Sequence, residues 1–156
     1  MSPPSTTMHA SQLLQYLRQH RLAVQASVSA SGSAQAAVVG FAVSDQFEFV
    51  FDTVASTRKA LNIRHNPRVA LVVGGWVAGD ERTAQIDGIA DEPVGDELQR
   101  LKAMYYDVYP DGRDRLRWEG LIYVRVRPTW VRYSDYLANP PQIVEFATDQ
   151  LRDPAG

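Results

Sequence analysis

The chain has 156 residues, 45% of them hydrophobic and 22% charged, which is the composition of one globular domain with an ordinary core. Its formal net charge of −2 lacks the basic excess that binding to nucleic acid or to an anionic membrane surface requires. Cysteine is absent, which excludes disulfides, thiolate metal sites and a nucleophilic thiol.

The two ends of the chain carry no regular hydrophobic pattern. We expect residues 1–8 to be a disordered N-terminal segment, residues 9–148 to be the single domain and residues 149–156 to be a frayed tail. The first residues show no cationic start followed by an apolar run, and no window is long enough to span a membrane. A cytoplasmic location is therefore the expectation.

The first half of the domain predicts a helix followed by a strand meander. Residues 9–20 place Leu13, Leu14 and Leu17 on one helical face. From Leu22 the period changes to two, and turns at residues 31–33 and 44–46 separate this strand from strands at 36–43 and 47–51. In the first strand we expect the apolar side chains to face the core and the polar ones to face solvent. The apolar set is Leu22, Val24, Ala26, Val28 and Ala30; the polar set is Gln25, Ser27 and Ser29.

The second half predicts helices at residues 56–64 and 95–109 and strands at 69–73, 83–90 and 122–133. Asn66-Pro67 ends the first of these helices, because the residue before proline avoids helical dihedral angles. Pro128 should produce a bulge in the last strand. Six strands with about three flanking helices favour a mainly β, antiparallel barrel over a doubly wound α/β fold.

The most informative stretch for chemistry follows the strand that ends at Thr53. Ser56 is suited to cap the next helix, which places Arg58 and Lys59 in its first turn. Two cations at a positive helix N-terminus are unfavourable unless an anion lies there, and a phosphate monoester would resolve the conflict. The alternative is that both side chains are simply solvated.

Other kinds of site have little support in the sequence. There is no glycine-rich phosphate loop and no Gly-x-Ser-x-Gly nucleophile motif. His9, His20 and His65 are scattered without metal-ligand spacing, so no metal site is expected.

Four blocks in order resemble FMN-binding split-barrel proteins related to pyridoxamine 5′-phosphate oxidase. The resemblance extends from Leu22 to Tyr136. The blocks are Thr53-x-x-Ser56-x-Arg58-Lys59, Asn62-Ile63 with Asn66-Pro67-Arg68-Val69-Ala70-Leu71, Gln85-Ile86-x-Gly88-x-Ala90, and Trp130-Val131-Arg132-Tyr133-Ser134-Asp135-Tyr136. The resemblance implies a six-stranded split barrel and a homodimer with FMN at the subunit interface.

The resemblance also implies roles for individual residues. Ser56, Arg58 and Lys59 would hold the FMN phosphate, and Thr53 would contact the phosphate or the ribityl chain. The residues implied to lie along or beside the flavin ring are Val38, Val39, Gly40, Gln85, Trp130 and Arg132. For Gln85 and Arg132 a solvated strand position is the alternative, and for Trp130 the alternative is packing at a barrel end.

The function implied is an FMN-dependent oxidoreductase in which the flavin carries the redox chemistry and no catalytic side chain is assigned. A deazaflavin reductase and a flavin-binding protein without turnover are the alternatives. A basic C-terminal motif for a vitamin B6 phosphate is not found after Tyr136, so the substrate and the electron donor stay open. The family also has haem-binding relatives, but no histidine here lies in an evident pocket-forming segment.

Overall fold

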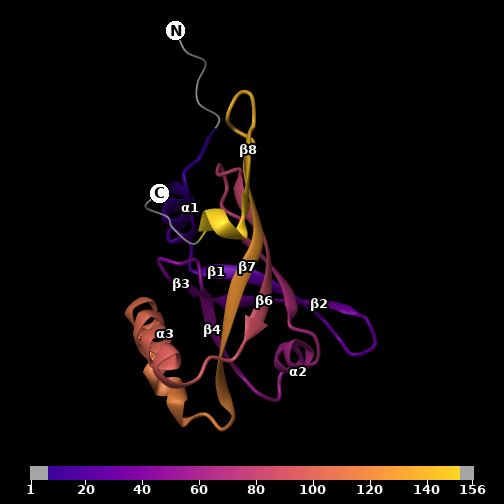
Figure 1. The fold of residues 1–156 in the computed structure, drawn as a ribbon, viewed down its shortest axis with the longest axis vertical. Coiled ribbons are helices and arrows are strands. Elements are labelled where there is room, and N and C mark those ends of the chain that lie inside the picture. The colour runs from indigo at the N-terminus through magenta and orange to yellow at the C-terminus, as the bar shows by residue number, and fades with distance from the viewer. Residues whose placement is uncertain (1–6, 152–156) are drawn as a thin grey trace.

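The computed structural model describes residues 7–151, in which eight strands form one antiparallel sheet with helices around it (Figure 1). The helices are α1 (Ala10–Leu17), α2 (Arg58–His65) and α3 (Gly95–Val108), with 3-10 helices at Pro110–Arg117 and Thr148–Leu151. The strands are β1 (Leu22–Val28), β2 (Ala34–Gly40), β3 (Ala42–Val43), β4 (Phe49–Val54), β5 (Arg68–Gly74), β6 (Arg82–Asp91), β7 (Leu121–Asp135) and β8 (Gln142–Ala147).

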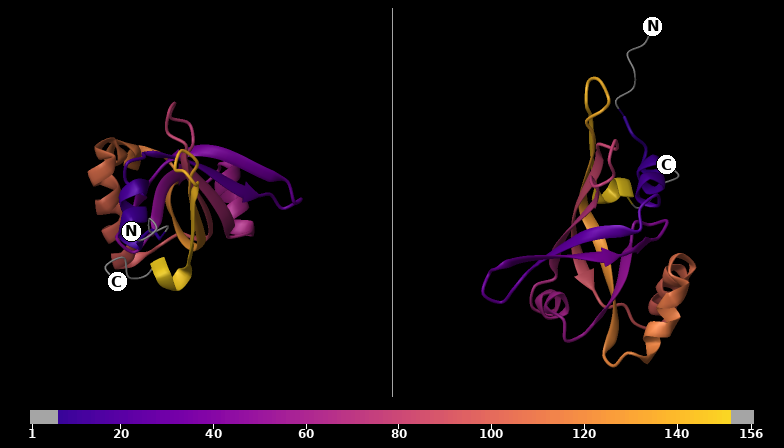
Figure 2. Two further views of the ribbon diagram at one scale, coloured as in Figure 1. Left: turned by 90° about the horizontal axis from the view of Figure 1, so that it is seen from above. Right: turned by 180° about the vertical axis from the view of Figure 1, so that it is seen from behind.

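The sheet closes on itself because its two edges are joined in the sequence. The strand order is β2-β1-β5-β6-β7-β4-β3, and β8 pairs with β7 outside this order. Only Phe41 separates β2 from β3, so the first and last strands of the order must meet. Figure 2 shows the resulting curled sheet, with α2 and α3 on opposite sides of it. The predicted split-barrel class is confirmed, with eight strands in place of six.

One face of the strands builds the main core together with α1. Phe41, Phe47, Phe49 and Phe51 are at most 2% exposed and belong to the same apolar cluster as the leucines of α1. Full burial of a side chain of this size stabilises the fold by about 1.5–3 kcal/mol. A smaller apolar cluster, which includes Tyr105, Tyr106 and Tyr123, joins α3 to the sheet. Buried tyrosine hydroxyl groups need hydrogen bonds.

β1 turns the opposite face to the barrel from the one we expected. Ala23, Gln25 and Ser27 are at most 3% exposed, whereas Leu22 is 48% exposed and Val24 is half-buried. The expectation was wrong because alternation defines two faces of a strand without saying which face meets the core. β1 therefore exposes the apolar side chain of Leu22 and buries the polar side chains of Gln25 and Ser27.

A β-bulge in β7 is located at the proline predicted to cause it. Gly88 of β6 pairs with Pro128, but the preceding residue Asp87 pairs with Trp130, so Thr129 is the extra residue. Val126 before the bulge and Val131 after it both face the core. The bulge therefore changes which positions of β7 point inward.

The ordered chain also reaches further than the predicted domain end at residue 148. β8 was not predicted, and after it Leu151 lies in the core at 2% exposure. Residues 149–151 are thus part of the fold rather than of a frayed tail, and Met8 packs against the core at the other end. Residues 1–6 and 152–156 of the two expected disordered segments lie outside the described residues.

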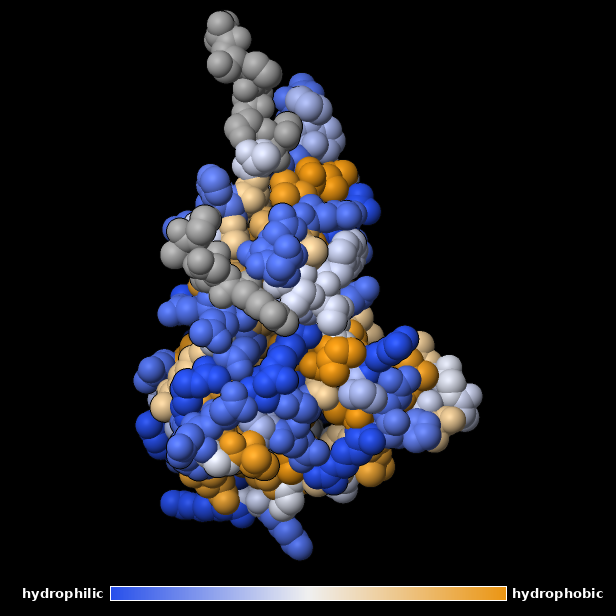
Figure 3. All heavy atoms as spheres, viewed as in Figure 1, coloured by the Kyte–Doolittle hydropathy of each residue, from blue (hydrophilic) through white to orange (hydrophobic). Residues whose placement is uncertain are grey.

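The surface seen in Figure 3 is mostly hydrophilic, and its apolar side chains gather in small separate groups. Within residues 7–151, no helix has the length and apolar character needed to cross a bilayer.

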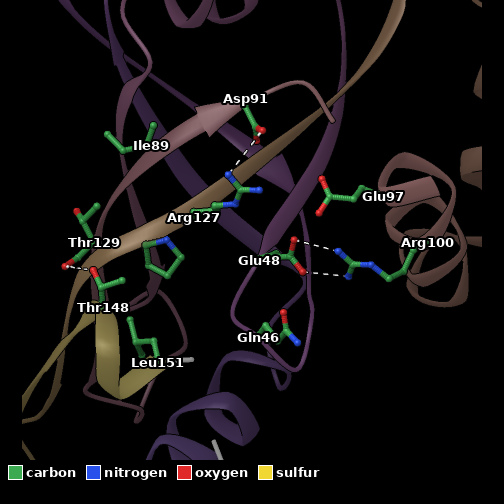
Figure 4. Close-up of a pocket in the computed structure, with 11 residues that line it drawn as sticks. Gln46, Glu48, Ile89, Asp91, Glu97, Arg100, Arg127, Thr129, Thr148 and Leu151 are labelled. Atoms are coloured by element: carbon green, nitrogen blue, oxygen red, sulfur yellow. Dashed lines mark hydrogen bonds and ion pairs between the residues drawn. The ribbon is translucent and has the colours of Figure 1, made fainter. Parts of the chain in front are cut away.

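A buried arginine links β7 to the turn before β4 and to β6. The Arg125 side chain is 3% exposed, and its guanidinium lies 3.1 Å from Glu48 and 2.6 Å from Asp91. Glu48 also accepts two hydrogen bonds from Arg100 at 3.0 and 3.1 Å. These charges border a hollow of about 610 Å³, which Arg127 also lines (Figure 4). Because acids and bases pair with one another there, the hollow does not favour a ligand of either charge.

Burial of Glu48 favours its neutral form, but hydrogen bonds from Arg100 and Ser44 outweigh burial and lower the pKa of Glu48 below its ordinary value of 4.5. A lowered folded-state pKa means that Glu48 contributes its full stabilisation above the unfolded-state pKa. This contribution is lost as the pH falls through the folded-state pKa.

We predict that Glu48→Gln lowers the free energy of unfolding at pH 7 by about 2 kcal/mol, because it weakens the charge-assisted hydrogen bonds from Arg125 and Arg100. Arg125 keeps Asp91 and Glu97 as partners. The difference from the wild-type protein should shrink as the pH falls below the ordinary value of 4.5 and through the lowered folded-state pKa of Glu48. Urea unfolding at pH 7 and at acid pH measures both effects. Asp45→Asn, which breaks an exposed pair with Arg18, is the control and should change little. A similar loss in both variants would contradict the structural role of Glu48.

Candidate phosphate and cofactor site

The start of α2 lies beside a pocket of about 440 Å³ formed against the inward face of β1 and β2. Three predicted phosphate ligands, Ser56, Arg58 and Lys59, line this pocket together with six further residues. The six are Gln25, Ser27, Gln35, Ala36, Ala37 and Thr57. The structure therefore brings the predicted cluster together at the beginning of a helix.

Thr57, rather than Ser56, caps this helix. The Thr57 hydroxyl accepts a hydrogen bond from the backbone N–H of Ala60 at 3.4 Å and donates one to the carbonyl of Val54 at 2.8 Å. Its single proton is then used, so the contact of 3.0 Å with Thr53 is one in which Thr53 donates. Thr53 is 7% exposed and supports the cap instead of lining the pocket. The residue missed in the sequence was Thr57, one position nearer the helix than the expected cap.

The two cations at the start of α2 lack acidic partners. The ion pairs found within residues 7–151 include neither Arg58 nor Lys59. Arg58 donates from Nε to the amide oxygen of Gln35 at 3.2 Å, a neutral acceptor. Of the N–H groups in the first helical turn, that of Ala60 is bonded to Thr57, and those of Arg58 and Lys59 have no partner within the helix. Cations, free N–H groups and a hydroxyl cap together suit a phosphate group.

A second set of predicted residues lies on the outer face of the sheet, away from this pocket. Strand pairing aligns one row of directly opposed residues across β2, β1, β5, β6 and β7. The row is Val38, Val24, Val72, Gln85 and Arg132. The neighbouring row is Ala36, Ala26, Ala70, Asp87 and Trp130. Four predicted ring contacts are thus on one face. The three alanine side chains are short, so they leave part of that face flat.

Two polar atoms on this outer face are buried without a partner. They are Arg132 Nε and the hydroxyl of Ser134, which follows Arg132 on the same face of β7. Ala26 and Ala70 line a hollow of about 520 Å³ together with the charged Asp87 and Arg68, and Arg132 and Ser134 are not among its lining residues. The outer face therefore offers small apolar side chains along one row and unpartnered polar atoms further along β7.

Two of the predicted ring contacts are placed differently. Val39 is 7% exposed and its side chain belongs to the main core. Gly40 is covered by a tyrosine, because a Cβ atom at this position would lie 2.9 Å from the Tyr109 hydroxyl. The glycine is therefore explained by packing against Tyr109, and only Val38 of the three offers an exposed side chain.

The phosphate pocket and the outer-face rows are on different sides of the sheet. Gln25, Ser27 and Gln35 of the pocket have the inward parity of β1 and β2, whereas Val38 and Gln85 point outward. β2 is an edge strand, and its Ala36 both lines the pocket and belongs to the outer row. A single chain therefore presents most of the two halves on different faces of the sheet, and the two halves meet at Ala36.

Histidines contribute to neither half. In the part of the chain that the structure describes, no group of three or more acidic or histidine side chains could hold a metal ion. His20 does line a pocket of about 500 Å³ that also contains Met104, which the sequence did not indicate. Its Nε2 atom is buried without a partner, and burial lowers the pKa of His20.

Comparison with known families identifies this arrangement. Residues 10–135 match the family described as pyridoxamine 5′-phosphate oxidase, which is most of the chain. The chain belongs to this family. The resemblance seen in the sequence is thereby confirmed, and the matched region includes both the phosphate pocket and the outer-face rows. No curated protein matches the chain in sequence.

Solved structures show the same fold at low sequence identity. A haem-binding protein from Mycobacterium smegmatis has a TM-score of 0.79 at 16% identity over 97% of this chain, which spans only 62% of that protein. The haem storage protein HutZ from Vibrio cholerae has a TM-score of 0.64 at 18% identity, covering 78% of this chain and 91% of HutZ. A Clostridium acetobutylicum protein related to general stress protein 26, of the pyridoxine phosphate oxidase family, has 0.67 at 12% identity, with coverages of 90% and 98%.

We predict that Thr57→Val lowers the free energy of unfolding by about 1 kcal/mol, because the helix loses its capping acceptor. Ser56→Ala should change stability little, since Ser56 is exposed and makes no hydrogen bond to the described residues. Urea unfolding of the two variants makes the comparison. A greater loss in Ser56→Ala would contradict the assignment of the cap.

Proposed function

We propose that this protein binds FMN and acts as an oxidoreductase that passes hydride or electrons between a reduced donor and a small-molecule substrate. The observation that carries the proposal is the pocket at the start of α2, where Arg58 and Lys59 lack acidic partners. An anion with several acceptor oxygens would satisfy both cations and the free N–H groups of the helix. A phosphate monoester is the biological group that fits this need best.

The residues of the chain fit a phosphorylated flavin in both halves of the site. Ser56, Thr57, Arg58 and Lys59 would hold the phosphate, and the alanine row would accept a flat ring. Gln85 and Arg132 lie directly opposite each other on β6 and β7, so both could donate hydrogen bonds to one edge of the ring. The unpartnered Arg132 Nε supports this assignment.

A bound flavin would supply the redox chemistry, and the protein would supply binding, orientation and exclusion of water. The residues of the chain are therefore proposed to position the flavin rather than to react with the substrate. The helix start fixes the phosphate end, Gln85 and Arg132 fix the polar edge of the ring, and Trp130 on the neighbouring row covers its side. Hydrogen bonds from Gln85 and Arg132 would also tune the reduction potential of the flavin.

We further propose that the protein is a homodimer whose interface is the outer face of β1, β2, β5 and β6. Leu22, Val38, Val72 and Ile89 are 37–63% exposed on these strands, all with outward parity. Apolar side chains spread across four paired strands gain from being covered by a second copy. A dimer would also allow one chain to supply the phosphate pocket and its partner to supply Gln85, Trp130 and Arg132.

We predict that Val38→Glu converts the protein from a dimer to a monomer, because it places a charge on the proposed interface. Light scattering should give twice the chain mass of 17.4 kDa for the wild-type protein and the chain mass for the variant. Val94→Glu, at an exposed valine in the connection between β6 and α3, is the matched control and should remain dimeric. A monomeric wild-type protein would refute the interface.

Two alternatives keep the same phosphate pocket. A deazaflavin cofactor also carries a phosphate on a hydroxylated side chain, and mass spectrometry of the purified protein would distinguish it from FMN. A flavin-binding protein without turnover is supported by the lack of an assigned acid or base near Gln85 and Arg132. Mixing the flavin-loaded protein with NADH or NADPH tests this, since bleaching of the flavin absorbance indicates an enzyme.

Haem is the competing cofactor suggested by two of the structural neighbours. In this chain, His20 is the histidine that lines a pocket, and Met104 lines the same pocket. The Nε2 atom of His20 is buried without a partner among residues 7–151, as Arg132 Nε and the Gln25 amide are, so this pocket is the place where haem would bind. Titration with hemin beside titration with FMN compares the two, and tighter binding of hemin would overturn the flavin proposal.

We predict that the double variant Arg58→Ala with Lys59→Ala weakens FMN binding by at least a hundredfold and riboflavin binding hardly at all. Only FMN carries the phosphate, and each charge-assisted hydrogen bond contributes about 1.5–3 kcal/mol, or tenfold or more in affinity. Fluorescence titration with the two flavins measures the difference. Equal weakening of both would indicate another binding site or a folding defect.

A further inference from the structure

Gln25 is a buried polar side chain without a partner, and it lies next to the phosphate pocket. It is in the middle of β1, is 1% exposed and pairs with Ala37 on β2 and Leu71 on β5. Among residues 7–151, neither its amide nitrogen nor its amide oxygen has a hydrogen-bond partner. Ser27, the next residue on the same face of β1, accepts a hydrogen bond from Asn62. A buried amide left in this state destabilises a fold, so its presence needs a reason.

Gln35 lines the same pocket as Gln25 and holds the positions that a ligand would take. Its oxygen accepts hydrogen bonds from Arg58 Nε at 3.2 Å and from Asn62 Nδ2 at 2.8 Å. The neutral amide oxygen of Gln35 thus lies where the donors of Arg58 and Asn62 converge. A phosphate oxygen is a stronger acceptor and would displace it. A phosphate that replaces Gln35 in this pocket would lie beside the Gln25 amide, which lines the same pocket.

We propose that Gln25 binds the ligand of this pocket and selects a phosphate monoester carried on a hydroxylated chain. The hydrogen-bond donors and acceptors of the Gln25 amide determine which ligand complements it. A primary amide presents two N–H donors and one acceptor, whereas a phosphate monoester dianion only accepts. A phosphate oxygen can satisfy the amide nitrogen of Gln25, but its amide oxygen needs a donor close by. A hydroxyl group on the chain next to the phosphate supplies that donor.

The inference deepens the proposed function, because it concerns the same pocket, but it does not depend on a flavin ring. The selected ligand class is a sugar-alcohol phosphate, and the ribityl phosphate end of FMN is one member of it. An alkyl phosphate without hydroxyl groups would leave the Gln25 oxygen unpaired. Selectivity between these two fragments is therefore the property that Gln25 should determine.

The test compares ribitol 5-phosphate with pentyl phosphate, which has the same chain length without hydroxyl groups. NMR titration of the full chain measures both affinities. We expect the wild-type protein to prefer ribitol 5-phosphate by about tenfold, as one or two hydrogen bonds would give. Gln25→Met, which keeps the length of the side chain and removes its polar atoms, should reduce the preference to less than twofold. It should also raise the melting temperature of the unliganded protein.

Gln99→Met is the matched control, because Gln99 is exposed on α3 and away from the pocket. It should leave both the preference and the melting temperature unchanged. If Gln25→Met does not fold, the shift of the Gln25 side-chain NH₂ signal of the wild-type protein on adding each fragment replaces the variant. A larger shift with ribitol 5-phosphate supports the proposal, and equal shifts overturn it.

The outcomes separate this inference from the flavin proposal. Unchanged selectivity in a folded Gln25→Met variant, or a wild-type protein that binds neither fragment, would overturn the role of Gln25. Normal FMN binding in the first case would leave the proposed function intact. A preference for ribitol 5-phosphate that Gln25→Met abolishes, in a protein that does not bind FMN, would support Gln25 and refute the flavin.

Discussion

Closure of the sheet through Phe41 is the constraint on which the rest of the molecule depends. The edge strands β2 and β3 are one continuous stretch of chain, so the sheet must curl until they meet. The phenylalanines and the leucines of α1 fill the interior that this creates. The remaining faces of the strands are then outside the barrel, whatever their polarity. This is why Val38 and Val72 can be exposed while Gln25 and Ser27 are enclosed.

Secondary structure followed from the sequence more readily than orientation did. Helical and strand periods located α1, α3 and most strands, because each segment buries side chains at regular intervals. The direction of β1 was not predictable in this way, since both of its faces are covered in part and alternation is symmetric. β8 was missed because its apolar residues do not alternate cleanly and two prolines come before it.

In the candidate site, too, some residues could be found from the sequence and others could not. Arg58 and Lys59 could be found in the sequence, because two cations at a helix start conflict with the helix dipole unless an anion is nearby. Gln25 could not be found, since a glutamine in an alternating strand looks like a solvated residue until its burial is known. Gly40 matched the family pattern, yet its lack of a side chain is explained by the approach of Tyr109. Position in a motif and role in a site are therefore separate questions.

The extra residue at Thr129 sets the parity of the second half of β7. Before the bulge the even-numbered residues Val124 and Val126 face the core, and after it the odd-numbered Val131 and Tyr133 do. If the same residues alternated without a bulge, Trp130 and Arg132 would continue the inward series and point into the barrel. The presence or absence of this bulge therefore decides which set of side chains is offered to a ligand, with no substitution needed. Members of the fold could diverge in what they bind by gaining or losing the bulge at this position.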